Sequence, residues 1–177
     1  EFGQLQVFAE SAEAFLQPDQ RAALTAASAL AAALAIRLKD YPGARAQLDA
    51  VQVEWQQDPQ LLEQLAMIYD RMGESARCAQ TCEAALALVP DNRNLHELRA
   101  QSYLNLGATA SAVAAYREAL VKFPHSTVLN RNLGITLYNL EDWSQARGYL
   151  QAATGGGADS LDLLLLVAEC YYHEGHM

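Results

Sequence analysis

The chain has 177 residues, of which 51% are hydrophobic and 19% are charged, and its formal net charge is −9. An acidic chain repels phosphate backbones and anionic lipid headgroups, so this charge argues against nucleic acids and membrane surfaces as partners. The sequence also contains no run of about 18 apolar residues that could cross a bilayer, so no membrane insertion is expected.

Residues 1–24 form the first predicted segment. Apolar residues recur at helical intervals between Leu5 and Phe15, which predicts a flanking helix over residues 4–16. Pro18 then ends this helix, because proline cannot continue the hydrogen-bonding pattern.

From about residue 25 the sequence repeats itself every 34 residues. Pro90 and Pro124 are 34 positions apart, and each follows an alanine–leucine run that predicts the last turns of a helix. In the first helix of each period a small residue precedes a bulky one by three positions. In the second helix three positions recur: a small residue, a mostly bulky residue four positions later, and a mostly small residue three positions after that. The aligned sets are Ala66, Ala100, Gly134 and Ala168; Tyr69, Tyr103, Leu137 and Tyr171; Ala44, Cys78, Ala112 and Ala146; Leu48, Cys82, Tyr116 and Leu150; Val51, Ala85, Ala119 and Ala153; and, in the turns, Gly73, Gly107 and Gly175, with Glu141-Asp142-Trp143 in the remaining copy.

This pattern resembles the tetratricopeptide repeat over roughly residues 25–177. The resemblance implies an all-α fold, a right-handed superhelical solenoid of antiparallel helix-turn-helix hairpins (an α-α superhelix). One hairpin cannot bury its apolar face alone, so stacked hairpins are expected to share a core. The implied repeats are 25–58, 59–92, 93–126 and 127–160, with a partial repeat at 161–177; the match is weakest at 25–58, where alanines replace most bulky positions of the first helix.

Capping residues mark the starts of three predicted helices. Asp58, Ser126 and Ser160 each place a side-chain oxygen just before an apolar-periodic run, as N-cap residues do. Pro59 suits the first position of a helix. The predicted hairpins therefore begin beside these residues, and residues 154–159, with three glycines, are predicted to form a flexible loop.

Neither a catalytic site nor a metal site is predicted, and no cofactor is expected. Cys170, His173 and His176 are spaced three apart on a predicted helix, as zinc ligands can be. However, a closed zinc site needs four ligands, and Cys170 aligns with buried first-helix positions. Stoichiometric zinc in the purified protein would instead identify an enzyme.

The remaining cysteines and histidines also have simple structural interpretations. Cys78 and Cys82 coincide with second-helix core positions, so both are interpreted as buried apolar residues rather than a redox pair. An odd set of three cysteines disfavours a disulfide framework and favours a reducing compartment, although the localisation itself stays open. His96 and His125 have no partners in a triad order and are predicted to be solvated residues at helix starts. The three consecutive glycines follow no predicted strand and lack the Gly-Lys-Ser/Thr of a phosphate-binding loop.

The resemblance places a binding surface on a concave face that the first helices line. Amide side chains are prominent there, and they offer both donors and acceptors to the backbone of an extended peptide. Taken one at a time, the same residues are equally compatible with a solvated surface. No lysine lies on this face, which disfavours capture of a C-terminal carboxylate as some members of the family perform it. The implied partner-binding residues are Gln64, Met67, Asp70 and Arg71; Glu97, Gln101, Leu104 and Asn105; and Arg131, Asn132, Ile135, Tyr138 and Asn139.

The sequence therefore predicts a protein–protein interaction scaffold, not an enzyme, that binds a protein or an extended peptide. The alternative is a regulatory or assembly module of a larger bacterial protein whose catalytic, DNA-binding or export domain lies outside this chain. The last predicted helix, which begins at Leu161, is among the most apolar stretches, and no second helix follows to cover it. Self-association through residues 161–177 is therefore predicted.

Overall fold

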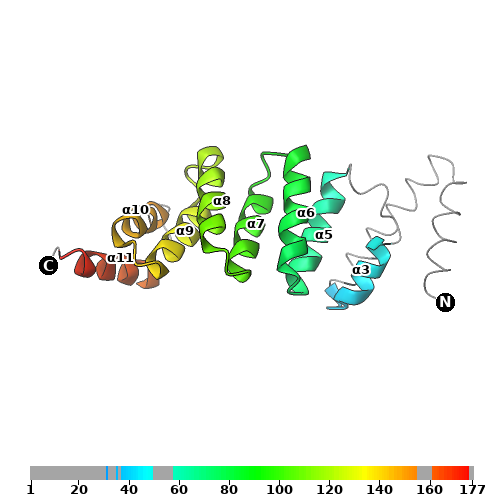
Figure 1. Cartoon of the computed structure of the whole chain (residues 1–177), viewed down its shortest axis with the longest axis horizontal. Coiled ribbons are helices and arrows are strands. Elements are labelled where there is room, and N and C mark those ends of the chain that lie inside the picture. The colour runs from blue at the N-terminus through cyan, green and yellow to red at the C-terminus, as the bar shows by residue number, and fades with distance from the viewer. Residues whose placement is uncertain (1–30, 32–34, 36, 50–57, 155–160, 176–177) are drawn as a thin grey trace, which may run out of the picture. The chain divides into compact units, whose positions relative to one another are not determined.

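The computed structural model describes residues 31, 35, 37–49, 58–154 and 161–175. Across these residues every regular element is an α-helix (Figure 1), as the sequence predicts. No helix in this described part of the chain is long and apolar enough to cross a membrane. The predicted flanking helix at 4–16 and the glycine loop after Thr154 lie outside the described residues.

The chain divides into two compact units, residues 1–89 and 90–177. In the first unit α5 packs against α6, and α3 packs against α5. In the second unit each helix packs against the next one along the chain, from α7 to α11. The first unit holds α3 (Tyr41–Asp49), α5 (Pro59–Arg71) and α6 (Ser75–Leu88); the second holds α7 (Arg93–Asn105), α8 (Thr109–Lys122), α9 (Thr127–Asn139), α10 (Trp143–Thr154) and α11 (Leu161–His173).

The first helices of the hairpins start at side-chain caps. The Asp58 carboxylate accepts hydrogen bonds from the backbone N–H groups of Gln60 and Leu61, and the Ser126 hydroxyl accepts one from Leu129, which confirms two predicted caps. Asn92 caps α7 in the same way, accepting from the backbone N–H groups of the second and third helical residues, although the sequence reading did not single it out. The third predicted cap precedes Leu161 and lies outside the described residues, but α11 does begin at Leu161.

The small residues lie where paired helices approach each other. In the first unit Ala66 and Cys78 are fully buried, and the Cys78 thiol lies 3.2 Å from the carbonyl oxygen of Ala66, to which it donates. Cys82 is fully buried as well, so both cysteines occupy the core positions that the sequence predicts. In the second unit Ala100, Ala112 and Ala146 are also fully buried. Side chains larger than these would separate the helices, so the repeat needs small residues here.

The second unit has a continuous core that all five of its helices supply. Tyr116, Leu137 and Leu150 hold bulky positions of the 34-residue alignment, and further buried leucines of α9 and α11 complete the core. This core includes Tyr116, Leu129, Leu133, Leu137, Leu150, Leu163 and Cys170.

A left-handed residue closes each first helix, and these residues also follow the 34-residue step. Positive φ angles occur at Lys39, Gly73, Gly107, Glu141 and Gly175. After four of them the next residue donates its backbone N–H to the carbonyl five positions earlier: Asp40 to Ala35, Glu74 to Tyr69, Ala108 to Tyr103 and Asp142 to Leu137. This is the Schellman arrangement, which satisfies carbonyls at a helix end and requires a left-handed residue.

Glu141 occupies this position although its Cβ disfavours it, so Glu141→Gly is expected to stabilise the second unit. Its φ of 61° is one that L-residues adopt at a cost of roughly 1–2 kcal/mol. Thermal unfolding should show Glu141→Gly more stable than Glu141→Ala by about 1 kcal/mol, since alanine removes the carboxylate but keeps the Cβ. Equal melting temperatures for the two variants would mean that this turn is not strained.

His96 corrects one prediction. Instead of being solvated, its side chain is only 1% exposed, and its Nε2–H donates to the carbonyl oxygen of Pro90 at 2.9 Å. Asn130, 34 residues later, donates in the same way to the carbonyl oxygen of Pro124 at 3.1 Å. The loops before α7 and α9 each turn a carbonyl group inward, and a buried carbonyl needs a donor. His125 is exposed, as predicted.

Candidate functional site

A pocket of about 380 Å³ opens between α7, α8 and α9 in the second unit. Residues near the C-terminal ends of the two first helices supply most of its wall, and α8 supplies the remainder. The lining residues are Gln101, Leu104, Thr109, Tyr116, Asn132, Ile135, Thr136, Asn139 and Leu140.

The pocket brings together predicted binding residues from two successive first helices. Gln101 of α7 lies with Asn132, Ile135 and Asn139 of α9 in its lining. Leu104 of α7, also predicted, lines it as well. The resemblance to the repeat family assigns the binding surface to the first helices, which is why the sequence could indicate this set.

Two further predicted residues lie against the lining through hydrogen bonds. The Asn132 amide donates to the Glu97 carboxylate at 3.2 Å, which links α9 to α7. The Gln101 amide donates to the side-chain oxygen of Asn105 at 3.2 Å, within α7. Glu97 is half-buried, whereas Asn105 is exposed. The pocket wall is therefore a network of amides with one carboxylate beside it.

Tyr116 is the functional candidate that the sequence reading missed. Its side chain is fully buried, and its hydroxyl makes no well-formed hydrogen bond with any described residue. Burial raises the pKa of Tyr116 to about 12; the negative charge of Glu97 adds to the rise, and the nearby Asn132 amide offsets part of it. The alignment contained a signal for this: the equivalent second-helix sites hold Cys82 and Leu150, which have no hydroxyl, whereas Tyr116 does.

The remaining predicted residues of α9 have other surroundings. Arg131 is exposed on the helix. Tyr138 packs edge-to-face against Trp143, with ring centroids 5.1 Å apart, and its hydroxyl donates to the Glu169 carboxylate of α11. This hydrogen bond raises the pKa of the Tyr138 phenol. Tyr138 is thus engaged with the next hairpin's helix rather than free in the pocket.

The first unit carries the other four predicted residues on α5. Met67 is 43% exposed, Arg71 is exposed, and Asp70 and Gln64 are half-buried. The Gln64 side-chain oxygen is buried and accepts no hydrogen bond from the described part of the chain. These residues line no part of the pocket in the second unit.

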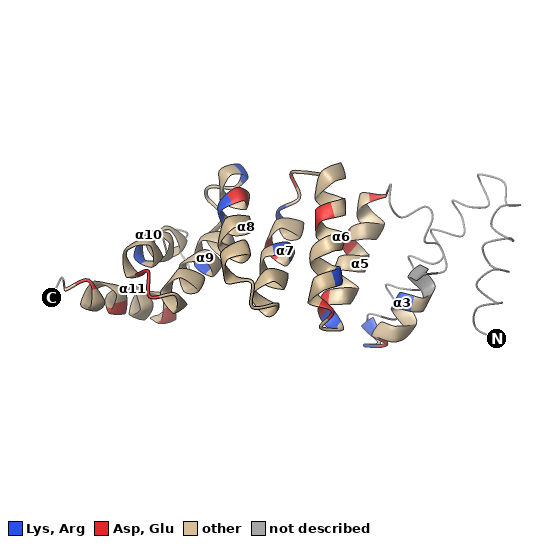
Figure 2. Ribbon diagram, in the orientation of Figure 1, with Lys and Arg blue, Asp and Glu red and all other residues tan. Residues whose placement is uncertain are grey.

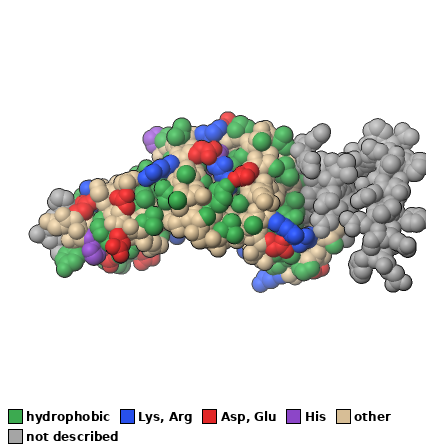
Figure 3. Space-filling model, in the orientation of Figure 1, with side chains coloured by type: hydrophobic (Ala, Val, Ile, Leu, Met, Phe, Trp, Pro, Cys, Tyr) green, Lys and Arg blue, Asp and Glu red, His purple; other side chains and the backbone are tan. Residues whose placement is uncertain are grey.

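α11 covers the end of the second unit but leaves much of its own apolar surface exposed. Leu164 is 48% exposed, whereas its counterparts one and two periods earlier, Asn130 and His96, are 4% and 1% exposed. Leu161, Leu165 and Tyr172 are also exposed. Figure 3 shows apolar side chains at the surface of this end of the molecule, next to acidic ones.

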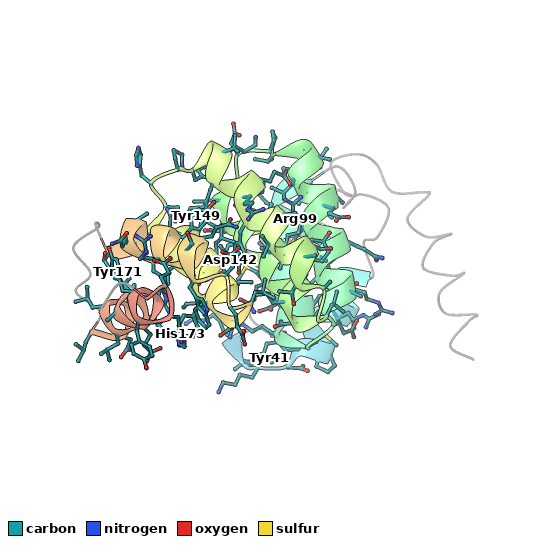
Figure 4. The ribbon with its side chains drawn as sticks, turned by 60° about the vertical axis from the view of Figure 1, so that its left-hand side comes forward. Tyr41, Arg99, Asp142, Tyr149, Tyr171 and His173 are labelled. Carbon is teal, nitrogen blue, oxygen red and sulfur yellow. The ribbon has the colours of Figure 1, made fainter. Side chains whose placement is uncertain are left out.

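Side chains of α10 hold α11 in place by contacting His173 and Glu174. The His173 ring, labelled in Figure 4, stacks on Trp143 with centroids 4.2 Å apart, and Arg147 pairs with Glu174 at 2.9 Å. Cys170 is fully buried, and burial raises the pKa of its thiol. Among the described residues no group of three His, Cys, Asp or Glu side chains is placed to hold a metal ion.

A family model described as tetratricopeptide repeat matches residues 64–127 and 131–177. Among solved structures, that of MamA protein has a TM-score of 0.79 at 12% identity and covers 86% of this chain and 83% of its own. A tetratricopeptide repeat protein from Parabacteroides merdae ATCC 43184 has a TM-score of 0.77 at 20% identity, and the match covers 86% of this chain and 61% of that one. Pseudomonas aeruginosa PilF has a TM-score of 0.69 at 16% identity, and the match covers 88% of this chain and 71% of that one. At such identities these likenesses show a shared fold, the predicted all-α solenoid of helical hairpins. No curated protein sequence matches the chain.

Proposed function

This chain belongs to the tetratricopeptide repeat family, and from that membership we propose that it is an interaction scaffold whose second unit binds an extended segment of a partner protein. The pocket between α7, α8 and α9 is the binding site. The observation that supports this proposal is the row of amides from two first helices, Gln101, Asn132 and Asn139, on one concave surface. Amides can pair with both the N–H and the C=O groups of a peptide backbone.

Apolar residues beside the amides supply the remaining requirement of a peptide site. Leu104, Ile135 and Leu140 line the same pocket, so partner side chains can bury apolar surface there while the backbone is held by hydrogen bonds. Of the wider predicted set, the α5 residues Gln64, Met67, Asp70 and Arg71 are proposed to contact the partner as a separate surface of the first unit.

The double variant Asn105→Ala with Asn139→Ala should weaken partner binding by up to about thirtyfold, because at most two amide hydrogen bonds of roughly 1 kcal/mol each are lost. Both side chains are exposed, so the free energy of unfolding should change by less than about 1 kcal/mol. A partner isolated with the intact chain can be titrated calorimetrically against both forms.

The matched control is Gln80→Ala with Ser144→Ala, two exposed polar residues of second helices that lie outside the pocket lining. This pair should bind the partner like the parent. If the parent, the control and the Asn105→Ala, Asn139→Ala variant all bound the partner with equal affinity, the binding surface would lie elsewhere on the chain.

We also propose that the chain self-associates through α11, with a second copy's α11 as the occupant of its exposed apolar face. In the earlier hairpins a second helix of the same chain packs on the first helix, as α6, α8 and α10 do. On α11 that covering is missing from the described residues, and Leu161, Leu164 and Leu165 are exposed. Two copies can pair this face isologously, because each offers the surface that the other needs.

Light scattering at tens of micromolar should therefore report a dimer, and Leu164→Glu with Leu165→Glu, both on the exposed face of α11, should convert it to a monomer, because carboxylates resist burial in an apolar interface. Leu88→Glu with Val121→Glu, which adds the same two charges at exposed apolar residues of α6 and α8, is the control and should leave the dimer intact. A monomeric parent at that concentration would contradict the proposal.

A further inference from the structure

The hydrogen bonds of the pocket leave its wall rich in acceptors. The Asn132 amide nitrogen is used by Glu97, and the Gln101 amide nitrogen is used by Asn105. Each of these amides therefore keeps its carbonyl oxygen available, while one of its donor hydrogens is already engaged. At each of these two amides a ligand finds an oxygen with two lone pairs but one remaining N–H.

The pocket has a negative charge beside it, that of Glu97. Glu97 makes no ion pair with any described residue, and the described lining residues include no lysine or arginine. Three basic residues of α7 and α8 have partners elsewhere: Arg99 pairs with Glu118 at 2.7 Å, Lys122 pairs with Asp91 at 2.8 Å, and Arg117 donates to Gln145 at 2.7 Å. Arg93, at the start of α7, makes no ion pair with Glu97. Figure 2 shows acidic residues but no basic ones on α11, the helix whose Glu169 accepts from Tyr138.

The Tyr116 hydroxyl adds a buried polar atom without a well-formed hydrogen bond. Tyr116 lines the pocket, and the nearby Asn132 amide is the one described group that acts on its hydroxyl as a hydrogen-bond donor. A buried polar group without a partner costs free energy comparable to a lost hydrogen bond, so a ligand donor that reaches it gains that amount on binding. The Glu97 charge lies close enough to act on this phenol.

We propose that this pocket binds one lysine or arginine side chain of the partner peptide, and this assignment rests on the proposed peptide-binding function. The cationic head pairs with Glu97 and donates to the free oxygens of Gln101, Asn132 and Tyr116. Its alkyl stem packs on Leu104 and Ile135. The volume of about 380 Å³ is at the lower end for ligand sites, which suits one long side chain with its flanking backbone. A carboxylate would meet acceptors and a like charge, so an acidic residue is excluded from the same place.

The test uses short serine–alanine peptides that differ only in one central residue: lysine, norleucine or glutamate. Norleucine keeps the alkyl stem and lacks the ammonium, so it isolates the contribution of the charge. Titration into the isotope-labelled full chain, followed by NMR, should shift the amide signals of Gln101 and Asn132 most with the lysine peptide. The lysine peptide should bind at least about tenfold more tightly than the norleucine peptide, as expected for charge-assisted hydrogen bonds.

Glu97→Gln should remove most of that preference, whereas Glu83→Gln, an equal change of charge on an exposed residue of α6, should leave it unchanged. Tyr116→Phe should reduce lysine-peptide affinity without reducing stability, a separation that a purely structural role would not produce. Peptides that bind in the pocket with equal affinity whatever the central residue would overturn the basic-residue assignment and leave the peptide groove intact. Shifts confined to other surfaces, or none at millimolar peptide, would overturn the assignment and count against the groove as well.

Discussion

Gly134→Ala is expected to lower the free energy of unfolding of the second unit by about 1–3 kcal/mol. A Cβ at this buried position of α9 would lie 2.8 Å from Leu150 Cγ and 3.0 Å from the backbone nitrogen of Leu150 in α10. The leucine side chain can rotate, but the backbone atom cannot, so α10 must shift. This cost exceeds the gain in helix propensity, which is at most about 1 kcal/mol for glycine to alanine.

Gly148→Ala is the matched control, and its expected effect has the opposite sign. Gly148 lies within α10, and a Cβ there would meet nothing within 4 Å, so alanine should stabilise the unit by up to about 1 kcal/mol. Urea unfolding can be followed by Trp143 fluorescence in a Trp55→Phe background, so that the signal reports on the second unit. Equal stabilisation by both alanines would show that Leu150 does not lie over Gly134 and that the repeat register is wrong.

Tyr116→Phe is expected to make the second unit resistant to alkaline destabilisation. The folded chain raises the pKa of Tyr116 from 10.0 to about 12, first by burial and then through Glu97. The unfolded chain therefore loses this proton at a lower pH than the folded chain does. The stability that depends on this proton is fully present below about pH 10 and is lost as the pH rises towards about 12, in total roughly 2–3 kcal/mol.

Phenylalanine has no proton to lose, so the variant should keep those roughly 2–3 kcal/mol above about pH 10. Near neutral pH its stability should equal or slightly exceed that of the parent, because an unsatisfied buried hydroxyl is removed. Tyr172→Phe, at an exposed site of α11, is the control and should lose stability with pH as the parent does. Urea unfolding at about pH 8 and about pH 11.5 separates these outcomes, and parallel losses in parent and both variants would contradict the burial of this phenol.

The helices and their caps could be predicted because local chemistry determines them. Asp58 and Ser126 supply cap oxygens beside the chain they cap, and Pro90 and Pro124 stop the preceding helices whatever surrounds them. The 34-residue step then aligned core positions between hairpins, and the resemblance to the tetratricopeptide repeat assigned the binding surface to the first helices, which is how Gln101 was grouped with residues of α9.

The unpredicted features depend on atoms far away in the sequence or on the backbone. No sequence rule turned the Pro90 carbonyl inward, so His96 was expected in solvent although it is buried. The left-handed conformation of Glu141 follows from its register with Gly107 and Gly175 and not from its own preference. Tyr116 was read only as a core residue, because its alignment with Leu150 describes size and ignores the hydroxyl.

The central claim is that the second unit recognises its partner through the pocket between α7, α8 and α9. Site-specific photo-crosslinking tests it most directly, with the photoreactive residue at Asn139 in the lining or at Val121, which is 84% exposed on α8 and outside the lining. The claim predicts a covalent adduct with the partner from position 139 and none from position 121. Adding Asn105→Ala should reduce the yield of the adduct from position 139 in proportion to the loss of affinity. Adducts from position 121 with none from position 139 would contradict it.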